Sequence, residues 1–306
     1  MLAYDQSRCI LWTRCLPASS HRGTDLTPDD LAVRSFLVTG ANSGIGRALV
    51  EALAARKARL VLACRSEERA APVLEALRAR DPGVEARVLA IDLADLGSVR
   101  SAAASFLATG DRLDVLVNNA GIAGTHALSA DGFDLTYATN HIGPFLLTNL
   151  LLPRLLESAE GRVVNVASAA HRHTDHIDWT VLARRDTARR SAMADYAVTK
   201  LMNILHAREL ARRLVGTRVA TYSLHPGAVA SNIWRKVPQP LQGFIKLFML
   251  SSDHGARTPL YCATAPELRG VSGRYYAHDA ELAPSPLAQN DALAHELWEQ
   301  TEQILT

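Results

Sequence analysis

A strand, a glycine turn and a helix start follow one another directly from Phe36 to Arg47, in the sequence F-L-V-T-G-A-N-S-G-I-G-R. A short apolar run ends at Thr39, glycines follow at positions 40, 44 and 46, and a helical pattern begins at once. Such a turn lets the backbone approach a pyrophosphate and directs free N–H groups and the positive helix end towards it. The spacing G-x-x-x-G-x-G differs from the commonest dinucleotide motif, G-x-G-x-x-G, so residues further along the chain must decide what the turn binds.

Strand and helix patterns alternate along the chain. Short apolar strands are predicted at 35–38, 59–63, 87–91, 113–117, 163–167 and 218–224. Helices are predicted between them at 45–56, 67–80, 98–107, 131–157 and 191–214. This alternation implies right-handed crossovers and a parallel sheet covered by helices on both faces. We therefore predict an α/β fold with a Rossmann-type, doubly wound parallel sheet in a single domain.

The two ends of the chain follow this pattern less closely. Residues 1–30 have little sustained periodicity and are predicted to form a flexible N-terminal extension to a domain that spans 31–306. After residue 227, helices are predicted near 241–250 and at 253–264, a short strand at 273–276 and a final helix from 291. The apolar stretch 237–250 predicts a substrate lid at about 228–265, and a packing helix or a membrane-contact surface is the alternative.

Composition argues against several classes of function. The formal net charge is +2 and the pI is about 8.4, which is too near neutral to indicate nucleic-acid binding. No run approaches the roughly 18–20 apolar residues of a membrane helix. The beginning of the chain lacks a convincing signal peptide, and the four cysteines share no metal-ligand or disulfide-like spacing. We therefore predict a cytoplasmic protein with no integral membrane segment and no nucleic-acid partner.

Notable residues follow six of the predicted strands. They are the Gly40 turn, Cys64-Arg65, Asp92-Leu93, Asn118–Gly121, Ser168 and Pro226-Gly227. In a parallel sheet of this kind, ligands bind outside the carboxyl ends of the strands, near the point where the strand order reverses. These residues are therefore predicted to converge on one ligand site.

Tyr196 and Lys200 form the sequence Y-A-V-T-K and lie four residues apart on one face of a predicted helix. A phenol has a pKa of about 10 and is a poor acid at neutral pH. A neighbouring ammonium favours the phenolate, so Lys200 could make Tyr196 a usable general acid and base. The alternative for an isolated Y-x-x-x-K is an amphipathic helix that carries both residues by chance, and the glycine turn favours the catalytic interpretation.

Together these motifs resemble the short-chain dehydrogenase/reductase family. The matching pieces occur in family order over about residues 30–280: T-G-A-N-S-G-I-G at 39–46, D-L at 92–93, N-N-A-G at 118–121, T-N-H-I-G-P-F-L-L-T at 139–148, V-N-V-A-S at 164–168, Y-A-V-T-K at 196–200 and H-P-G-A-V-A-S at 225–231. Within the family, A-C-R-S-E-E-R, V-N-V-A-S-A-A-H and T-P-L-Y-C-A look like the retinol-dehydrogenase-like branch. The long interval between Ser168 and Tyr196 also resembles that branch.

The resemblance implies a catalytic tetrad of Asn140, Ser168, Tyr196 and Lys200. Tyr196 would give a proton to the carbonyl oxygen in reduction, or take one from the alcohol in oxidation, and Ser168 would hydrogen-bond the same oxygen. Lys200 would hold the nicotinamide ribose hydroxyls and lower the pKa of Tyr196. Asn140 would anchor a water that links Lys200 to solvent. The structural alternatives are a strand-end cap for Ser168 and a helix-bend role for Asn140.

The family pattern also implies the residues that bind a nicotinamide dinucleotide. They are Gly40, Asn42, Ser43, Gly44, Ile45, Gly46, Arg65, Asp92, Leu93, Asn118, Ala120, Gly121, Tyr196, Lys200, Pro226, Gly227, Val229 and Ser231. An acidic residue at the end of the second strand would bind the ribose 2′-hydroxyl and repel a 2′-phosphate. This chain has Ala63-Cys64-Arg65 there, and Arg pairs well with phosphate. NADP(H) is therefore predicted over NAD(H), with a solvent-facing Arg65 as the alternative.

The predicted function is hydride transfer between NADP(H) and an apolar aldehyde or ketone, or the matching alcohol. The alternatives are an NAD(H)-dependent enzyme of the same fold and a dinucleotide-sensing protein without catalysis, which would not need Tyr196. The loop 171–190 contains H-R-H-T-D-H, whose spacing matches no standard metal site, so we predict a polar lip of the substrate pocket and no metal. Family analogy suggests a homodimer or homotetramer that uses the helices of Asn140 and Tyr196.

Overall fold

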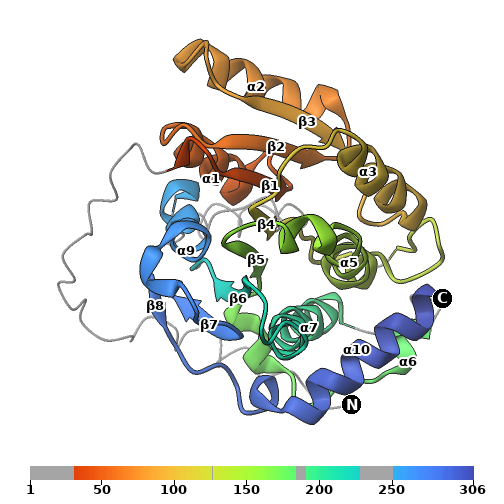
Figure 1. Cartoon of the computed structure of the whole chain (residues 1–306). Coiled ribbons are helices and arrows are strands. Elements are labelled where there is room, and N and C mark those ends of the chain that lie inside the picture. The colour runs from red at the N-terminus through yellow and green to blue at the C-terminus, as the bar shows by residue number, and fades with distance from the viewer. Residues whose placement is uncertain (1–30, 126, 184–190, 228–250) are drawn as a thin grey trace.

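One mostly parallel sheet positions the predicted ligand-binding loops. A computed structural model describes residues 31–125, 127–183, 191–227 and 251–306 (Figure 1). In these residues eight strands lie in the order β3-β2-β1-β4-β5-β6-β7-β8, and all neighbours are parallel except the β7–β8 hairpin. The strands are β1 (Ser35–Thr39), β2 (Arg59–Cys64), β3 (Ala86–Ala90), β4 (Val115–Asn118), β5 (Gly161–Val166), β6 (Val219–His225), β7 (Arg274–Ala277) and β8 (Ala280–Glu281). The strand order reverses at β1 and β4, so the predicted doubly wound α/β fold is confirmed.

Helices cover both faces of this sheet. They are α1 (Gly44–Ala54), α2 (Glu67–Arg80), α3 (Leu96–Ala108), α4 (Leu135–Tyr137), α5 (Gly143–Leu156), α6 (Thr180–Ala183), α7 (Ala192–Arg213), α9 (Ser252–Thr264) and α10 (Asp291–Leu305). Helices α1, α2 and α9 pack on one face, and α3, α5 and α7 pack on the other (Figure 1). Helix α10 lies outside α7, on the side away from the sheet (Figure 1).

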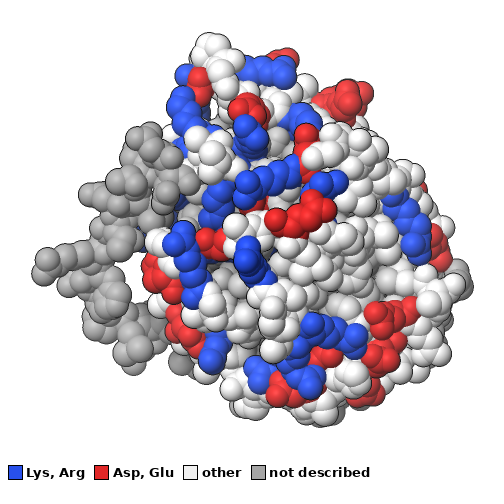
Figure 2. Space-filling model, in the orientation of Figure 1, with Lys and Arg blue, Asp and Glu red and all other residues white. Residues whose placement is uncertain are grey.

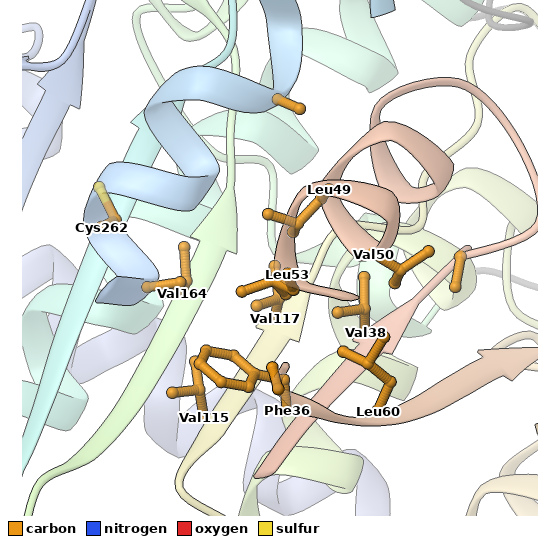
Figure 3. Packing of buried hydrophobic residues seen from close by; sticks show 14 of the residues in the cluster. Phe36, Val38, Leu49, Val50, Leu53, Leu60, Val115, Val117, Val164 and Cys262 are labelled. Atoms are coloured by element: carbon orange, nitrogen blue, oxygen red, sulfur yellow. The ribbon is translucent and has the colours of Figure 1, made fainter. Parts of the chain in front are cut away.

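Alternate residues of β1 pack into different cores, which explains the unbroken apolar sequence of this strand. Phe36 and Val38 belong to the cluster on the α1 face, together with Leu49 and Leu53 of α1 (Figure 3). Leu37 belongs to the cluster on the opposite face, with residues of α3 and α5. A strand that is covered on both faces needs apolar side chains at consecutive positions. The glycine turn therefore begins at the end of a strand that is held from both sides.

The predicted strands and most predicted helices within the described residues are confirmed, with ends that differ by no more than two residues. The long helical region predicted over 131–157 is present over 135–156 and begins four residues later than predicted. It consists of α4, a π-helical turn over 138–142 and then α5. The wider turn carries Asn140, whose side chain bonds to the loop after β4. The helical region is therefore found, but the π-helical turn within it was not predicted, because the contact that it makes joins residues far apart in the sequence.

Helix α9 coincides with the second half of the predicted lid. Its residues Ala256 and Cys262 are buried in the cluster that also holds α1, so this helix completes the core on that face. The first half of the predicted lid, 228–250, and the predicted extension 1–30 lie outside the described residues.

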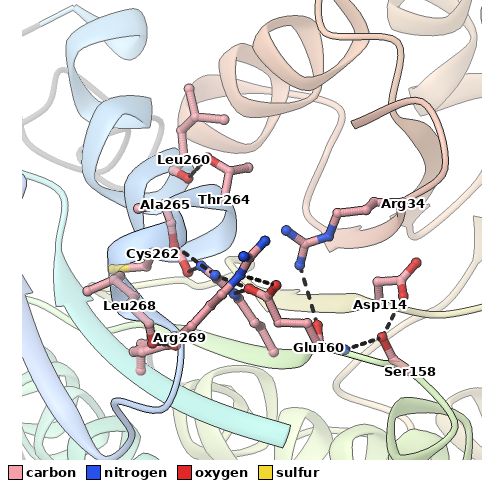
Figure 4. Close-up of polar contacts among 12 residues, drawn as sticks. Arg34, Asp114, Ser158, Glu160, Leu260, Cys262, Thr264, Ala265, Leu268 and Arg269 are labelled. Atoms are coloured by element: carbon pink, nitrogen blue, oxygen red, sulfur yellow. Dashed lines mark hydrogen bonds and ion pairs between the residues drawn. The ribbon is translucent and has the colours of Figure 1, made fainter. Parts of the chain in front are cut away.

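Arg162, at the start of β5, fixes the far end of α9 to the sheet. Figure 4 shows Cys262 and Ala265 at this end of α9, near Glu160 and Arg269. Its side chain is 1% exposed, and its guanidinium donates to the carbonyl oxygens of Cys262 at 3.0 Å and Ala265 at 2.7 Å. It also pairs with Glu160, which accepts a further bond from Arg269 at 2.7 Å. The last carbonyls of a helix have no partners inside the helix, so a buried guanidinium satisfies groups that water cannot reach. This contact lies at the amino-terminal edge of the sheet, away from the predicted ligand edge.

The surface carries charges of both signs. On the face shown in Figure 2, Lys and Arg residues are interspersed with Asp and Glu residues, in keeping with the formal net charge of +2. Among the described helices, none combines the length and the apolar character needed to cross a membrane.

Candidate active site

The glycine turn after β1 presents an uncapped helix N-terminus. Gly40 has a φ of +68°, which favours glycine, and a Cβ at Gly46 would lie 2.4 Å from the carbonyl oxygen of Gly40. Helix α1 begins at Gly44, its N-cap residue Ser43 makes no side-chain cap, and its first turn holds no acidic residue. The first N–H groups of α1 and its positive end therefore remain available to an anion, and the turn fits a dinucleotide pyrophosphate.

The turn is tied to the loop after β4 by Asn119, which was predicted to lie at the ligand site as part of 118–121 but was given no role of its own. The Asn119 side chain donates to the carbonyl oxygen of Thr39 at 2.8 Å. In return, the Thr39 hydroxyl accepts from the backbone N–H groups of Asn119 and Ala120, both at 3.0 Å. The same Asn119 amide nitrogen would lie 2.5 Å from a Cβ at Gly46. Asn119 therefore sets the shape of the predicted phosphate loop from the neighbouring strand.

The predicted adenine and ribose residues lie around this turn at the same edge of the sheet. The Asp92 carboxylate accepts from the N–H of Ala94 at 3.0 Å, so it caps its own turn, and Leu93 is buried. The Asn118 side chain points into the interior, where it donates to Thr148 at 3.0 Å. Asp92 and Asn118 thus have structural roles that their motifs alone did not distinguish from cofactor contacts.

Arg65 is exposed immediately after β2 and makes no ion pair with any described residue. Pro226 and Gly227 follow β6, and Gly227 has a φ of +90°, which favours glycine. The remaining predicted cofactor residues, Val229 and Ser231, lie outside the described part of the chain.

Tyr196, Ser168 and Lys200 come together between α7 and the end of β5. Tyr196 is 8% exposed and Lys200 is 3% exposed, and the Lys200 Nζ lies 5.5 Å from the centroid of the Tyr196 ring. The Ser168 hydroxyl hydrogen-bonds the Tyr196 phenol. Lys200 donates to the carbonyl oxygen of Val166 at 2.8 Å. The structure therefore brings three of the four predicted catalytic side chains together, with Tyr196 and Lys200 buried and Ser168 partly exposed.

Burial moves the pKa values of this pair in opposite directions. It raises the pKa of Tyr196 to about 12, and the hydrogen bond from Ser168 opposes this rise. It lowers the pKa of Lys200 to about 8, because a buried ammonium loses its hydration. The expected lowering of the Tyr196 pKa by Lys200 is therefore not found, because burial and Ser168 set this pKa.

Asn140 joins this group from the π-helical turn. Its Oδ1 accepts from the N–H of Ile122 at 2.8 Å, and its Nδ2 donates to the carbonyl oxygen of Ile122 at 2.9 Å and to the Thr199 hydroxyl at 3.0 Å. A Cβ at Gly121 would lie 3.3 Å from both the Asn140 Oδ1 and the Lys200 Nζ. Asn140 thus fixes the loop after β4 to α7. Thr199, which was given no role of its own in the sequence analysis, completes this contact.

His171 is fully buried, although the loop that begins with it was predicted to form a polar lip. It lies in the 3₁₀ turn Ala169–His173, directly after Ser168. The described residues include no group of three or more His, Cys, Asp or Glu side chains placed to hold a metal ion.

A helix N-terminus that can bind phosphate and a buried Tyr–Lys pair both lie where the strand order of the parallel sheet reverses. This arrangement is typical of an oxidoreductase that uses a dinucleotide. The sequence profile of the short chain dehydrogenase family matches residues 34–178. Dehydrogenase/reductase SDR family member 13 from Bos taurus is 45% identical over 89% of this chain and 73% of its own length. Retinol dehydrogenase 14 from Homo sapiens is 40% identical over 92% of this chain and 88% of its own length.

A solved structure of an uncharacterised protein from Mycobacterium paratuberculosis superposes with a TM-score of 0.70 and 33% identity, covering 92% of this chain and 97% of that one. The chain therefore belongs to the short-chain dehydrogenase/reductase family, in its retinol-dehydrogenase-like branch. It is an oxidoreductase that acts on alcohol or carbonyl groups with a nicotinamide dinucleotide.

Proposed function

We propose that this protein transfers a hydride between NADP(H) and an apolar aldehyde or ketone, or the matching alcohol, with Tyr196 as general acid and base. The observation that carries the proposal is the group formed by the buried residues Tyr196, Lys200 and Asn140 with Ser168, beside the loop that shapes the glycine turn. When bound, the nicotinamide supplies or accepts the hydride.

Each residue of the group has a separate role in this proposal. In reduction, the Tyr196 phenol donates its proton to the carbonyl oxygen, and the Ser168 hydroxyl donates a hydrogen bond to the same oxygen. Lys200 is cationic below its pKa of about 8, so at neutral pH it can bind the ribose hydroxyls and stabilise the phenolate that Tyr196 becomes. Asn140 holds the loop after β4 against α7, which keeps these groups at fixed separations.

The proposal of an apolar substrate rests on the names of the relatives and not on the lining of a pocket. Retinol dehydrogenases 14 and 12 from Homo sapiens, at 40% and 39% identity, are named after retinol, an apolar alcohol. Initial rates should therefore be compared across retinal, long aliphatic aldehydes, quinones and ketosteroids, with NADPH and with NADH. Oxidation of neither cofactor with any carbonyl would contradict the proposed substrate class.

Tyr196→Phe tests the general acid. The variant removes only the phenol oxygen, so turnover should fall by about 10² to 10⁴ while NADPH binding is retained. Turnover can be followed by NADPH absorbance, and binding can be followed by quenching of tryptophan fluorescence. Wild-type turnover in Tyr196→Phe would contradict the proposed acid. Binding without turnover in both proteins would favour the dinucleotide-sensing alternative.

Arg65→Ala tests the choice of cofactor. Arg65 follows β2 where no carboxylate is present to repel a 2′-phosphate, and its exposed guanidinium has no ion-pair partner among the described residues. The KM for NADPH should rise by about tenfold, the value of one charge-assisted contact, while the KM for NADH stays unchanged. Arg78→Ala, an exposed arginine at the far end of α2, is the matched control. Equal changes in both KM values would contradict the phosphate contact and leave NAD(H) as the alternative.

A further inference from the structure

His171 links Ser168 to the chain segment that follows β8. Its Nδ1 lies 2.7 Å from the carbonyl oxygen of Ser168, and its Nε2 lies 3.0 Å from the backbone N of Ser285. The ring is fully buried and packs edge-on against Tyr275 of β7, with ring centroids 5.2 Å apart. We infer that His171 is a positioning residue, which holds Ser168 in place for the reacting oxygen and makes the segment after β8 part of the support of the active site. This inference rests on the proposed function.

The two partners of His171 fix one tautomer of the ring. A carbonyl oxygen only accepts, so Nδ1 carries the hydrogen, and a backbone N–H only donates, so Nε2 carries the lone pair. The neutral ring satisfies both partners, whereas a protonated ring would place an N–H against the N–H of Ser285. Burial lowers the pKa of His171 to about 4, in agreement with the neutral form. The ring therefore acts as a rigid connection with both of its nitrogens occupied.

At the Ser168 end, this connection fixes the backbone that carries the hydroxyl. The Ser168 carbonyl accepts a second bond, from the backbone N–H of His171 at 3.2 Å. The Ser168 Oγ accepts from the N–H of Ala170 at 3.2 Å and also bonds to the Tyr196 phenol. The position of the Oγ relative to Tyr196 thus depends on the orientation of the Ser168 peptide. Small displacements of a positioning group can cost about 10²-fold in rate.

At the other end, the segment after β8 is held by contacts that do not involve Ser168. The N–H of Leu282 donates to the carbonyl oxygen of Tyr275 at 2.9 Å, which continues the pairing beyond the β7–β8 hairpin. Arg172 donates to the carbonyl oxygen of Ala283 at 2.5 Å. Arg172 therefore offers a matched control, because it contacts the same segment from the same turn and makes no bond to Ser168.

Three substitutions separate the two bonds of His171. In His171→Asn, the amide nitrogen stands at the same number of bonds from Cα as Nδ1, so the bond to Ser168 can be retained. In His171→Gln, the amide reaches as far as Nε2, so the bond to Ser285 can be retained instead. His171→Leu removes both bonds. We expect kcat to fall about 10- to 100-fold in His171→Leu and His171→Gln and less than about threefold in His171→Asn, with an unchanged KM for NADPH.

Steady-state kinetics and melting temperatures of the full-chain variants test the predicted order of their kcat values. The control variant Arg172→Gln should keep wild-type kcat. Because His171 acts through Ser168, adding His171→Leu to Ser168→Ala should lower kcat by less than about twofold further. A purely structural role would lower the melting temperature and multiply the two kcat losses, and that result would overturn the inference. If His171→Leu does not fold, equal kcat values for the Asn and Gln variants would overturn it.

The proposed function and this inference fail in different ways. Wild-type turnover in Tyr196→Phe would contradict the proposed function. Wild-type kcat in a folded His171→Leu variant, with turnover lost in Tyr196→Phe and Ser168→Ala, would overturn the role of His171 alone.

Discussion

At the scale of single residues, the charge of Lys200 changes near neutral pH. Its pKa of about 8 lies below the ordinary value of 10.5 because the side chain is buried in α7. A lowered lysine pKa means that the charged form is present below about pH 8 and is lost above it. The proposed contact with the ribose hydroxyls and the support of the Tyr196 phenolate both require this charge.

We therefore predict that kcat/KM for carbonyl reduction is nearly constant from pH 6 to 7 and falls as the pH rises through about 8. The profile should be measured with saturating NADPH, so that cofactor binding does not dominate it. Lys200→Met should show low activity without this fall. A wild-type profile that stays flat to about pH 9.5 would contradict the assignment.

Several site residues could be predicted from the sequence because each lies in a short sequence motif. Asn140, Ser168, Tyr196 and Lys200 are of this kind, and the fold brings them together. Asn119 and His171 were predicted at the site only as members of the segments 118–121 and 171–190, and Thr199 was not predicted there. The roles of these three residues come from bonds to segments far away in the sequence. No local pattern distinguishes such a bond from ordinary burial. The interior contact of Asn118 with Thr148 was hidden for the same reason, whereas the bond of Asp92 is local and caps its own turn.

At the scale of elements, the strands were predictable because both faces of the sheet are covered, so the central strands are unbroken apolar runs. Helix periodicity located α2 and α7 within a residue or two. The π-helical turn over 138–142 was not predictable, because one extra residue leaves the apolar pattern on either side intact. The contact between Arg162 and α9 was also hidden, since an arginine within a strand usually indicates an exposed position.

We predict that Arg162→Lys destabilises the protein by about 3 kcal/mol, because a lysine cannot reach both carbonyl oxygens and Glu160 at once. Urea unfolding followed by circular dichroism measures this free energy. Arg59→Lys is the matched control, because its pair with Glu85 is exposed and should contribute less than about 1 kcal/mol. A similar loss of unfolding free energy in both variants would contradict the prediction that the buried contacts of Arg162 contribute more to stability than the exposed pair of Arg59.

At the scale of the whole molecule, buried histidines join α10 to the rest of the fold. His141 bonds through Nε2 to Thr301 of α10 at 2.9 Å, and His206 of α7 packs against Trp298 of α10 with ring centroids 5.8 Å apart. The predicted homodimer or homotetramer stays a prediction. An assembly that uses the helices of Asn140 and Tyr196 would have to accommodate α10, because Trp298 also packs on Phe145 of α5 at 4.6 Å.

We predict that the protein loses stability in mild acid. Burial lowers the pKa of His141 to about 3 and of His206 to about 4, from an ordinary value of 6.5. The folded protein keeps both rings neutral while the unfolded chain binds protons below about pH 6.5, so stability is complete above that pH and falls as the pH drops towards 4. The melting temperature should decline over this window, and less steeply in His206→Phe. Identical pH dependence in both proteins would exclude a contribution from His206.

The contact of Thr39, Gly46 and Asn119 has a consequence for engineering the cofactor site. The glycine turn and the loop after β4 share these bonds, and the space beside Gly46 is filled by the side chain of Asn119 and by the backbone of Gly40. A turn transplanted from another dehydrogenase would meet an unmatched neighbour and lose its shape, even if every residue within the turn were correct. To exchange the nucleotide preference between such enzymes, residues 39–46 and 118–121 should therefore be transferred together, and residue 65 should be changed separately.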